Sequence, residues 1–200
     1  MLVIGLTGPS GAGKGAVGAI LSAHRIPVID ADAIYHGLLI PPSPCLDALK
    51  ERFGNGILLP SGELNRRALG EIVFSDPEAL QDLNRIAHGF VMKEIRTQLK
   101  ALREQDIPAA VIDAPQLFEA EADKDCNVIL SVLADKRTRL ERIMARDGID
   151  AEAALRRIEA QKSDEFFRAH SNYVLENNGS IDLLRPQIDR ILLETGVLAP

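Results

Sequence analysis

The chain has 200 residues, of which 46% are hydrophobic and 26% are charged, and its formal net charge is −6 at pH 7. This length provides one α/β core with a small inserted or covering segment, and it excludes a second full domain. The acidic balance excludes a nucleic-acid backbone as the main partner, because neutralising phosphates requires clustered Lys and Arg.

The two cysteines, Cys45 and Cys126, lie far apart in the sequence and lack metal-binding spacing. This predicts structural thiols in a reducing, cytoplasmic setting. No apolar run approaches the roughly 18 residues of a membrane span, and no basic leader precedes the first one. We therefore expect a soluble monomer or small homo-oligomer that acts on small molecules, with neither nucleic acid nor a membrane as partner.

The first predicted strand, residues 2–7, leads directly into GPSGAGKG at residues 8–15, which we call the phosphate loop. The pattern GxxxxGK[ST] surrounds a β-phosphate with backbone N–H groups, sends its lysine to the β/γ oxygens and places a hydroxyl on Mg²⁺. Lys14 is present, but Gly15 stands where the hydroxyl is expected. The loop predicts nucleotide binding, with the helix at 16–21 pointing its N-terminus at the phosphates, and leaves open how Mg²⁺ is held.

The segment GKGAVG at residues 13–18 also matches the GxGxxG dinucleotide fingerprint, and Asp30 or Asp32 stands near the position of a ribose-binding acid. In that fingerprint the first glycine ends the strand. Here the strand ends at Thr7, so the glycines of 13–18 fall within the helix. We therefore favour the phosphate loop over a dinucleotide site.

The second predicted strand, residues 27–30, runs into Asp30-Ala31-Asp32 at the carboxyl edge of the sheet, where open α/β sheets bind ligands. A carboxylate there can orient or deprotonate an attacking hydroxyl. It can also cap a helix. We favour the functional role for Asp32, whereas for Asp30 both interpretations stay open.

The stretch from residue 32 to 105 contains no convincing strand. After the breaker at residues 41–44, helical patterns cover residues 45–53, 65–74 and 76–103. Such an insertion between two strands is typical of a segment that covers a site. His88 is a lone histidine in one of these helices, and from the pattern alone a structural role is the simpler interpretation.

The third predicted strand, residues 109–113, ends in Asp113 and has the form of a Walker-B strand, whose acid holds Mg²⁺ directly or through water. A solvated strand-end carboxylate explains it equally well. If Gly15 does not contribute to the metal, the carboxylates of Asp32 and Asp113 become more important.

The fourth predicted strand, residues 127–132, precedes a densely charged segment at 136–168. We interpret most of its arginines as a salt-bridged helical surface. Arg146 and Arg157 flank the Asp147-Gly148 turn, which suits a closing lid that brings a cation to a transferring phosphoryl group. A strand at 173–175 and a helix at 181–195 complete the elements. The arginines are Arg137, Arg139, Arg142, Arg146, Arg156 and Arg157.

Seven segments in this order resemble the dephospho-coenzyme A kinase family along nearly the whole chain. They read GPSGAGKG, VIDADAI, GELNRRAL…VF, LNRIAH, IDAPQLFE, RLERIMARDG…RIEAQ and ENNG. The resemblance implies transfer of the ATP γ-phosphate to the 3′-hydroxyl of dephospho-coenzyme A, with Mg²⁺ as cofactor. It also implies one three-layer α/β/α P-loop domain of the nucleotide-kinase type over residues 1–200, with a parallel five-stranded sheet. Its parts are a core at 1–31, 106–135 and 170–200, a helical coenzyme-binding insertion at 32–105 and a lid at 136–169.

The resemblance also assigns roles by position. Catalysis falls to Lys14, Asp32 and Arg146, and metal binding to Asp32 and Asp113. The nucleotide would contact Gly11, Ala12, Gly13, Lys14, Gly15, Ala16, Asn177 and Asn178. The acceptor would contact Asp32, Arg66, His88, Leu117, Phe118 and Glu119.

Two alternatives stay open at this point. The Gly-Lys-Gly ending of the loop also suits an adenylate-kinase-like nucleotide kinase. Gly15 and Asn172, which depart from the family pattern, also suit a nucleotide- or coenzyme-binding regulator without catalysis.

Overall fold

The computed structural model describes residues 1–198, and its chain divides into two compact units. The first, which we call the sheet unit, contains residues 1–29 and the chain from Ala101 onward. The second, which we call the helical unit, contains residues 30–100. The helical unit occupies nearly the same part of the sequence as the coenzyme-binding insertion expected at 32–105.

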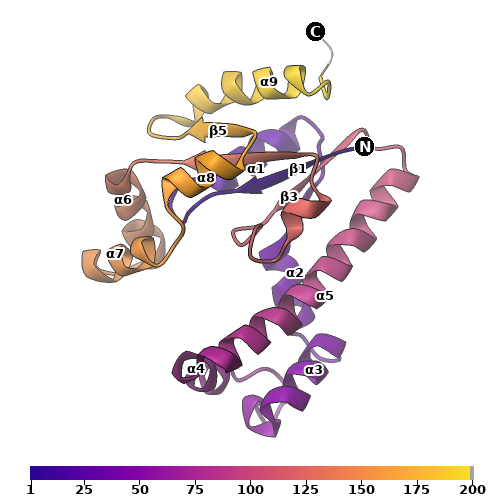
Figure 1. Cartoon of the computed structure of the whole chain (residues 1–200), viewed down its shortest axis with the longest axis vertical. Helices are drawn as coiled ribbons and strands as arrows, with labels where there is room; N and C mark the ends of the chain where they lie inside the picture. Colours follow the sequence, from indigo (N-terminus) through magenta and orange to yellow (C-terminus); the bar gives the residue numbers. More distant parts are fainter. Residues whose placement is uncertain (199–200) are drawn as a thin grey trace. The chain divides into compact units, whose positions relative to one another are not determined.

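The sheet has five strands in the order β2–β3–β1–β4–β5 (Figure 1). Strand β1 pairs in parallel with both β3 and β4, and β4 pairs in parallel with β5. Because β3 separates β1 from β2, the order differs from the 3-2-1-4-5-6 order of dinucleotide-binding folds. The strands are β1 (Leu2–Thr7), β2 (Val28–Asp30), β3 (Ala109–Asp113), β4 (Val128–Leu133) and β5 (Tyr173–Glu176).

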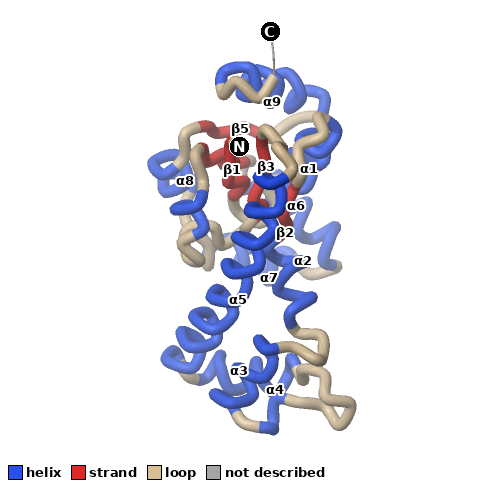
Figure 2. Tube along the Cα trace, turned by 90° about the vertical axis from the view of Figure 1, so that its right-hand side faces the viewer, coloured by secondary structure: helices blue, strands red, loops and turns tan. Residues whose placement is uncertain are grey.

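Both faces of the sheet are covered, which explains why its strands are almost continuously apolar. Helices α1 (Lys14–Ala23) and α9 (Leu184–Glu194) cover one face, where Ile4, Leu130 and Ile188 belong to one buried cluster. The other face carries buried Leu117 and helix α8 (Asp164–His170). In Figure 2, α1 and α8 lie on opposite sides of the strands, so the sheet is the middle of three layers.

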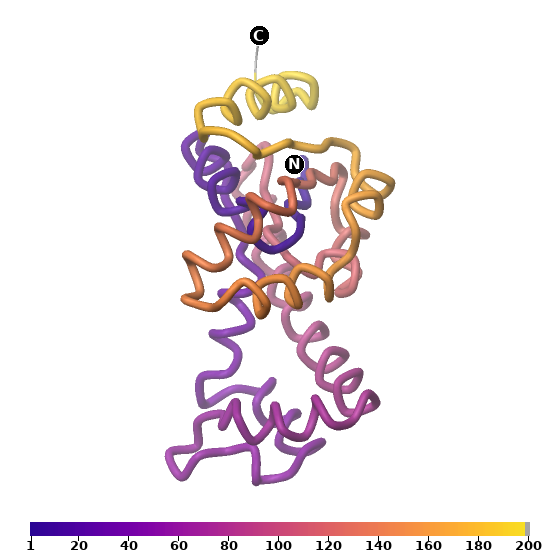
Figure 3. Tube along the Cα trace, turned by 90° about the vertical axis from the view of Figure 1, so that its left-hand side faces the viewer, coloured from indigo at the N-terminus to yellow at the C-terminus, as the bar shows by residue number. Residues whose placement is uncertain are grey.

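Between β4 and α8 the chain forms α6 (Lys136–Asp147) and α7 (Ala151–Glu159), which pack against each other through Ile143, Ala154 and Ile158. Helix α6 ends at a left-handed glycine, the Asp150 carboxylate caps α7, and the Ser163 hydroxyl caps α8. Figure 3 shows this orange segment on the same side of the sheet unit as the indigo turn that follows β1.

The helical unit consists of helices around its own core. They are α2 (Ala31–Leu38), α3 (Pro44–Phe53), α4 (Arg66–Ser75) and most of α5 (Pro77–Glu104). The expected helices match α3, α4 and α5 to within one residue at each end. Between residues 31 and 100 the structure has an isolated bridge, which joins Leu58 and Leu64. Across residues 1–198, no helix combines the length and apolar character that crossing a bilayer requires. The core residues are Leu39, Cys45, Leu49, Ile57, Leu69, Val73 and Ala79.

Candidate functional site

The phosphate loop is a tight turn that glycines make possible. The N–H of Ala12 donates to the carbonyl of Pro9 at 3.1 Å, and Gly11 and Gly13 have φ values of +79° and +98°. A Cβ atom on Gly11 would lie 2.7 Å from the carbonyl oxygen of Arg139, and one on Gly13 would lie 2.1 Å from Nδ2 of Asn177. Both positions therefore require glycine for backbone conformation and for space.

The loop delivers the chain directly into α1, whose first residue is Lys14. No side chain caps the N-terminus of α1, because the N-cap residue is Gly13. The first N–H groups of a helix have no partners within the helix, and together with the helix dipole they favour an anion. The start of α1 therefore fits the phosphate groups of a nucleotide.

Gly15 is the second residue of α1 and is exposed. A Cβ atom built on Gly15 meets no atom within 4 Å. Unlike Gly11 and Gly13, this glycine is not required by the packing of the loop, so the structure leaves room for the hydroxyl that the motif normally carries.

Two arginines of α6 donate hydrogen bonds to backbone carbonyls of the phosphate loop. Arg139 is only 5% exposed, and its Nε donates to the carbonyl of Ser10 at 3.0 Å. Nη1 of Arg142 donates to the carbonyls of Gly11 and Ala12, both at 3.3 Å. These two lie outside the expected salt-bridged surface, because Arg139 is buried where it pairs with Asp164 at 3.3 Å and Arg142 contacts the loop.

The expectation holds for other arginines of the segment. Arg137 pairs with Glu141 at 3.0 Å and Arg156 pairs with Glu152 at 2.5 Å, each one helical turn apart and exposed. The signal that separates the two groups is spacing, since residues 139, 142 and 146 recur at intervals that place them on one face of a helix.

The asparagines after β5 support the same region. Asn177 is buried, and its Nδ2 donates to the carbonyl of Ala12 at 2.7 Å. The Oδ1 of Asn178 accepts the backbone N–H of Asp135 at 2.7 Å, just before α6 begins. The pair therefore ties the phosphate loop and the start of α6 to the end of β5, and its contact with a nucleotide stays a prediction.

Arg146 lies at the end of α6 beside the loop. Its Nη2 donates to Oγ of Ser10 at 3.2 Å, and it forms a two-point ion pair with Asp147. Arg157 also donates to Asp147. The hydrogen bond from Arg146, followed by the charges of both arginines, holds the pKa of Asp147 below its ordinary value. The predicted lid arginine is therefore oriented by its neighbours and lies next to the loop.

The two aspartates that follow β2 have different positions. Oδ1 of Asp30 accepts the N–H of Ala33 at 2.9 Å and caps α2. Of the two interpretations left open for Asp30, capping is the one observed. Asp32 lies exposed in the first turn of α2 and is not the capping residue.

Asp113 ends β3, where it is opposite Leu6 in the parallel register. Within residues 1–198, no group of three or more His, Cys, Asp or Glu side chains is arranged to hold a metal ion. Mg²⁺ commonly uses one or two carboxylates and completes its shell with water and nucleotide oxygens, so a protein cage is not required. Metal binding by Asp32 and Asp113 stays a prediction.

The turn after β3 combines a buried anchor with an exposed end. Leu117 is fully buried beside Gly5, so its side chain holds the turn against the sheet. The ring of Phe118 contacts Phe166 of α8 edge to face, with centroids 5.2 Å apart. Glu119 is exposed. The acceptor roles assigned to these residues stay predictions.

In the helical unit, Arg66 is the first residue of α4, and its Nη2 lies 3.1 Å from Nδ1 of His36. Both side chains line a pocket of about 240 Å³ whose other walls include Leu39 and Leu64. A cation at a helix N-terminus is unfavourable with respect to the helix dipole, and the acceptor role of Arg66 stays a prediction. His88 lies within α5 and is partly buried.

Asn172, one of the departures from the family pattern, has a structural role. Its Oδ1 accepts the N–H of Ile129 at 2.8 Å, and its own N–H donates to the carbonyl of Ile129 at 3.0 Å. Asn172 thus satisfies the backbone at the start of the β4–β5 pairing. This position therefore gives no support to a regulator that has lost catalysis.

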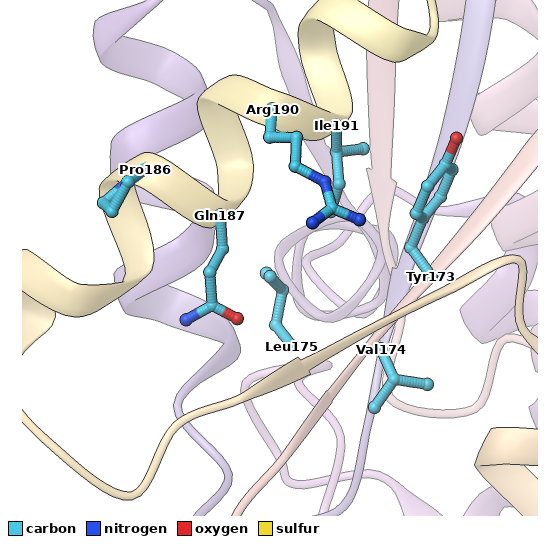
Figure 4. Close-up of a pocket in the computed structure, with 7 residues that line it drawn as sticks. All are labelled: Tyr173, Val174, Leu175, Pro186, Gln187, Arg190 and Ile191. Carbon is cyan, nitrogen blue, oxygen red and sulfur yellow. The ribbon is translucent and has the colours of Figure 1, made fainter.

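Another pocket, in the sheet unit, lies between β5 and α9 and has a volume of about 380 Å³ (Figure 4). Gln187 and Arg190 extend from α9 into this space toward the side of Leu175, and Tyr173 closes one side. None of the predicted site residues lines it. This pocket therefore adds no support to the predicted site.

Comparison with known proteins agrees with the geometry. A family model described as dephospho-CoA kinase matches residues 2–182. A protein of Symbiobacterium thermophilum named dephospho-CoA kinase is 39% identical over 189 residues, which cover 94% of this chain and 79% of that protein.

Solved structures share the fold. A crystal structure of a Thermus thermophilus protein has a TM-score of 0.82 and 34% identity, covering 96% of this chain and 97% of its own. A dephospho-CoA kinase from Campylobacter jejuni has a TM-score of 0.72 and 25% identity, with 98% of each chain covered. The expected nucleotide-kinase-like fold with a parallel five-stranded sheet is confirmed.

Proposed function

We propose that this chain, which belongs to the dephospho-CoA kinase family, transfers the γ-phosphoryl group of ATP to the 3′-hydroxyl of dephospho-coenzyme A and so produces coenzyme A. The observation that carries the proposal is the phosphate loop, whose glycine-dependent turn opens onto the uncapped N-terminus of α1 in a chain that matches the family over residues 2–182. The acceptor is an alcohol, so the activity is that of a phosphotransferase.

The ATP phosphates would be held by the backbone N–H groups of residues 11–16 and by the ammonium group of Lys14. Lysine acts here as a point charge that follows the phosphoryl group as negative charge shifts during transfer. Asp113 and Asp32 are the carboxylates that would hold Mg²⁺, with water completing its shell, and the ion would supply further charge neutralisation. Asn177 and Asn178 would support the nucleotide from the loop after β5.

Asp32 would orient the 3′-hydroxyl and accept its proton. The hydroxyl oxygen then forms a bond to the γ-phosphorus while the bond from that phosphorus to the β,γ-bridging oxygen breaks, and ADP carries away the electron pair. Because capping of α2 is performed by Asp30, the carboxylate of Asp32 is available for this role. Arg146 would stabilise the charge on the transferring group.

The acceptor contacts are assigned to residues by their positions in the family pattern. In the helical unit Arg66 offers a cation beside an amphipathic pocket, and His88 offers a ring nitrogen within α5. In the sheet unit the turn at residues 117–119 presents Phe118 and Glu119. We expect a cytoplasmic monomer or small homo-oligomer without nucleic-acid partners.

The test is a direct assay of the purified chain with ATP, Mg²⁺ and either dephospho-coenzyme A or AMP as acceptor. We expect coenzyme A and ADP in equal amounts, identified by chromatography. Faster turnover of AMP would instead favour an adenylate-kinase-like enzyme. A folded protein that binds ATP and forms no product with either acceptor would favour a non-catalytic regulator.

A further inference from the structure

We propose that Arg139 and Gln161 are positioning residues that hold the Ser10–Gly11 peptide of the phosphate loop in the orientation that binds nucleotide phosphate. The inference rests on the proposed function, because it concerns how the loop is prepared for ATP. It assigns a role in nucleotide binding to two residues that contact the phosphate loop through the backbone of Ser10.

The Ser10–Gly11 peptide is the central peptide of a turn that has two alternative forms. The N–H of Ala12 donates to the carbonyl of Pro9, so Ser10 and Gly11 are the two middle residues. A φ of +79° at Gly11 is the value of a type II turn, whereas a type I turn has a negative φ at this position. The two forms differ by a flip of the central peptide, which exchanges the directions of its C=O and N–H groups.

Arg139 selects one of these directions. Its Nε donates to the carbonyl oxygen of Ser10 at 3.0 Å, so this carbonyl points toward α6. A trans peptide is planar, with its C=O and N–H groups on opposite sides. The N–H of Gly11 therefore points away from α6. This N–H is the first of the groups, at residues 11–16, that are proposed to bind the ATP phosphates.

Gln161 binds the backbone N–H of Ser10, whose carbonyl is bound by Arg139. Its Oε1 accepts the N–H of Ser10 at 3.0 Å and also Nη2 of Arg139 at 3.1 Å. The backbone donor and the backbone acceptor of Ser10 are thus both engaged. A single side-chain oxygen links the loop to the arginine that orients it.

The guanidinium of Arg139 is itself fixed. Its third nitrogen, Nη1, donates to Oδ1 of Asp164 at 3.3 Å, so all three nitrogens have partners. The side chain is 6% exposed, and hydrogen bonds in such a low-dielectric setting are stronger than in water. Burial lowers the pKa of Arg139 and the nearby charge of Asp164 opposes this effect. A buried arginine with this set of contacts acts as a fixed fork, which lysine cannot reproduce.

The contacts also connect the predicted lid to the loop. Arg139 belongs to α6, Gln161 lies between α7 and α8, and Asp164 begins α8. The segment at 136–169 therefore sets the conformation of the phosphate loop through these two side chains, in addition to supplying Arg146.

The experiment compares Gln161→Ala and Arg139→Lys with the unchanged chain by calorimetric titration with ADP, and separately with dephospho-coenzyme A. Gln161 is exposed, so its truncation removes both hydrogen bonds with little risk to folding. We expect the Kd for ADP to rise about 10-fold in each variant, which corresponds to about 1.4 kcal/mol. The Kd for dephospho-coenzyme A and the melting temperature of Gln161→Ala should stay unchanged.

Two matched controls make the same types of substitution, Arg→Lys and Gln→Ala, at positions that do not contact Ser10. Arg137→Lys alters an exposed arginine two residues before Arg139 on α6, and Gln187→Ala removes a glutamine that donates to the carbonyl of Leu183 in the α9 region. Both should bind ADP like the unchanged chain. ADP binding by Gln161→Ala within twofold of normal, or an equal loss of affinity for dephospho-coenzyme A, would overturn the proposal.

The outcome is separable from the test of function. A chain that binds ADP but phosphorylates no acceptor would refute the kinase proposal, while the comparison of ADP affinities would still decide the roles of Arg139 and Gln161. If Arg139→Lys does not fold, Gln161→Ala alone decides.

Discussion

Arg146 is bound by Asp147 through both carboxylate oxygens: Nε donates to Oδ1 at 2.7 Å and Nη2 donates to Oδ2 at 2.9 Å. Such a bidentate, charge-assisted pair fixes the plane of a guanidinium as well as its position. The same Nη2 reaches the hydroxyl of Ser10, so the pair orients the predicted lid arginine along the edge of the phosphate loop.

Replacing Arg146 with Lys should lower kcat by about 10²-fold or more, in keeping with the large contributions of arginines that stabilise phosphoryl transfer. Lysine keeps the charge but loses the two-point pair, so we expect ATP affinity to change much less than kcat. Steady-state kinetics with dephospho-coenzyme A measure both quantities. Arg156→Lys, at an exposed pair of α7, is the control. A normal kcat would show that Arg146 only supports the structure.

The aspartates after β2 give a second, internally matched test. Asp32→Asn should lower kcat by about 10²-fold or more, the usual contribution of a general base, because an amide cannot accept the proton. Asp30→Asn should leave both activity and stability nearly unchanged, since Asn caps a helix about as well as Asp. Equal effects of the two substitutions on kcat would contradict the assignment.

Much of the sheet unit could be predicted from the sequence because its strands are apolar runs between clear breakers. β1 and β3 match the expected strands residue for residue, and β4 is displaced by one residue. Helix α2 was not predicted as a separate element, since it is short and contains Gly37, and its start depends on the cap by Asp30.

The site was less predictable than the fold because its supports come from distant parts of the chain. The spacing of residues 139, 142 and 146 places them on a different helix face from exposed Arg137, but nothing in the local pattern shows that this face is the one that buries Arg139. The difference arises only when α6 meets the carbonyls of the phosphate loop. In the same way, the family resemblance implies a nucleotide contact for Asn177, but no local pattern indicates its hydrogen bond to Ala12.

The two arginine partners of Asp82 allow a prediction of how the melting temperature depends on pH. Asp82 accepts Nε of Arg52 and Nη2 of Arg85, both at 2.6 Å, within the helical unit. The hydrogen bond from Arg85, followed by that from Arg52, lowers the pKa of Asp82 below its ordinary value of 3.8. The folded state therefore favours the carboxylate, and this stabilisation is present above the ordinary pKa and is lost as the pH falls through the lowered one.

Asp82→Asn should consequently melt at a lower temperature than the unchanged chain at pH 7, and the gap should close as the pH falls below about 4, where the unfolded carboxyl is protonated. Melting curves across this pH range measure the gap. Glu51→Gln, which removes a carboxylate from the exposed surface of α3, is the control and should show a smaller gap at pH 7. A gap for Asp82→Asn that does not depend on pH would contradict the ion-pair explanation.

Gly15 can be tested by restoring the hydroxyl that the loop motif normally carries. Because a Cβ atom there meets nothing within 4 Å, both Gly15→Ser and Gly15→Ala should fold, and Ala should stabilise α1 by less than the roughly 1 kcal/mol that applies in a helix interior. Only Ser adds an oxygen at the position that contacts Mg²⁺ in the motif. We therefore expect Gly15→Ser to reach half-maximal activity at a several-fold lower Mg²⁺ concentration, while Gly15→Ala follows the unchanged chain. The same Mg²⁺ dependence in both variants would show that the metal is fully coordinated by carboxylates, water and nucleotide oxygens without this position.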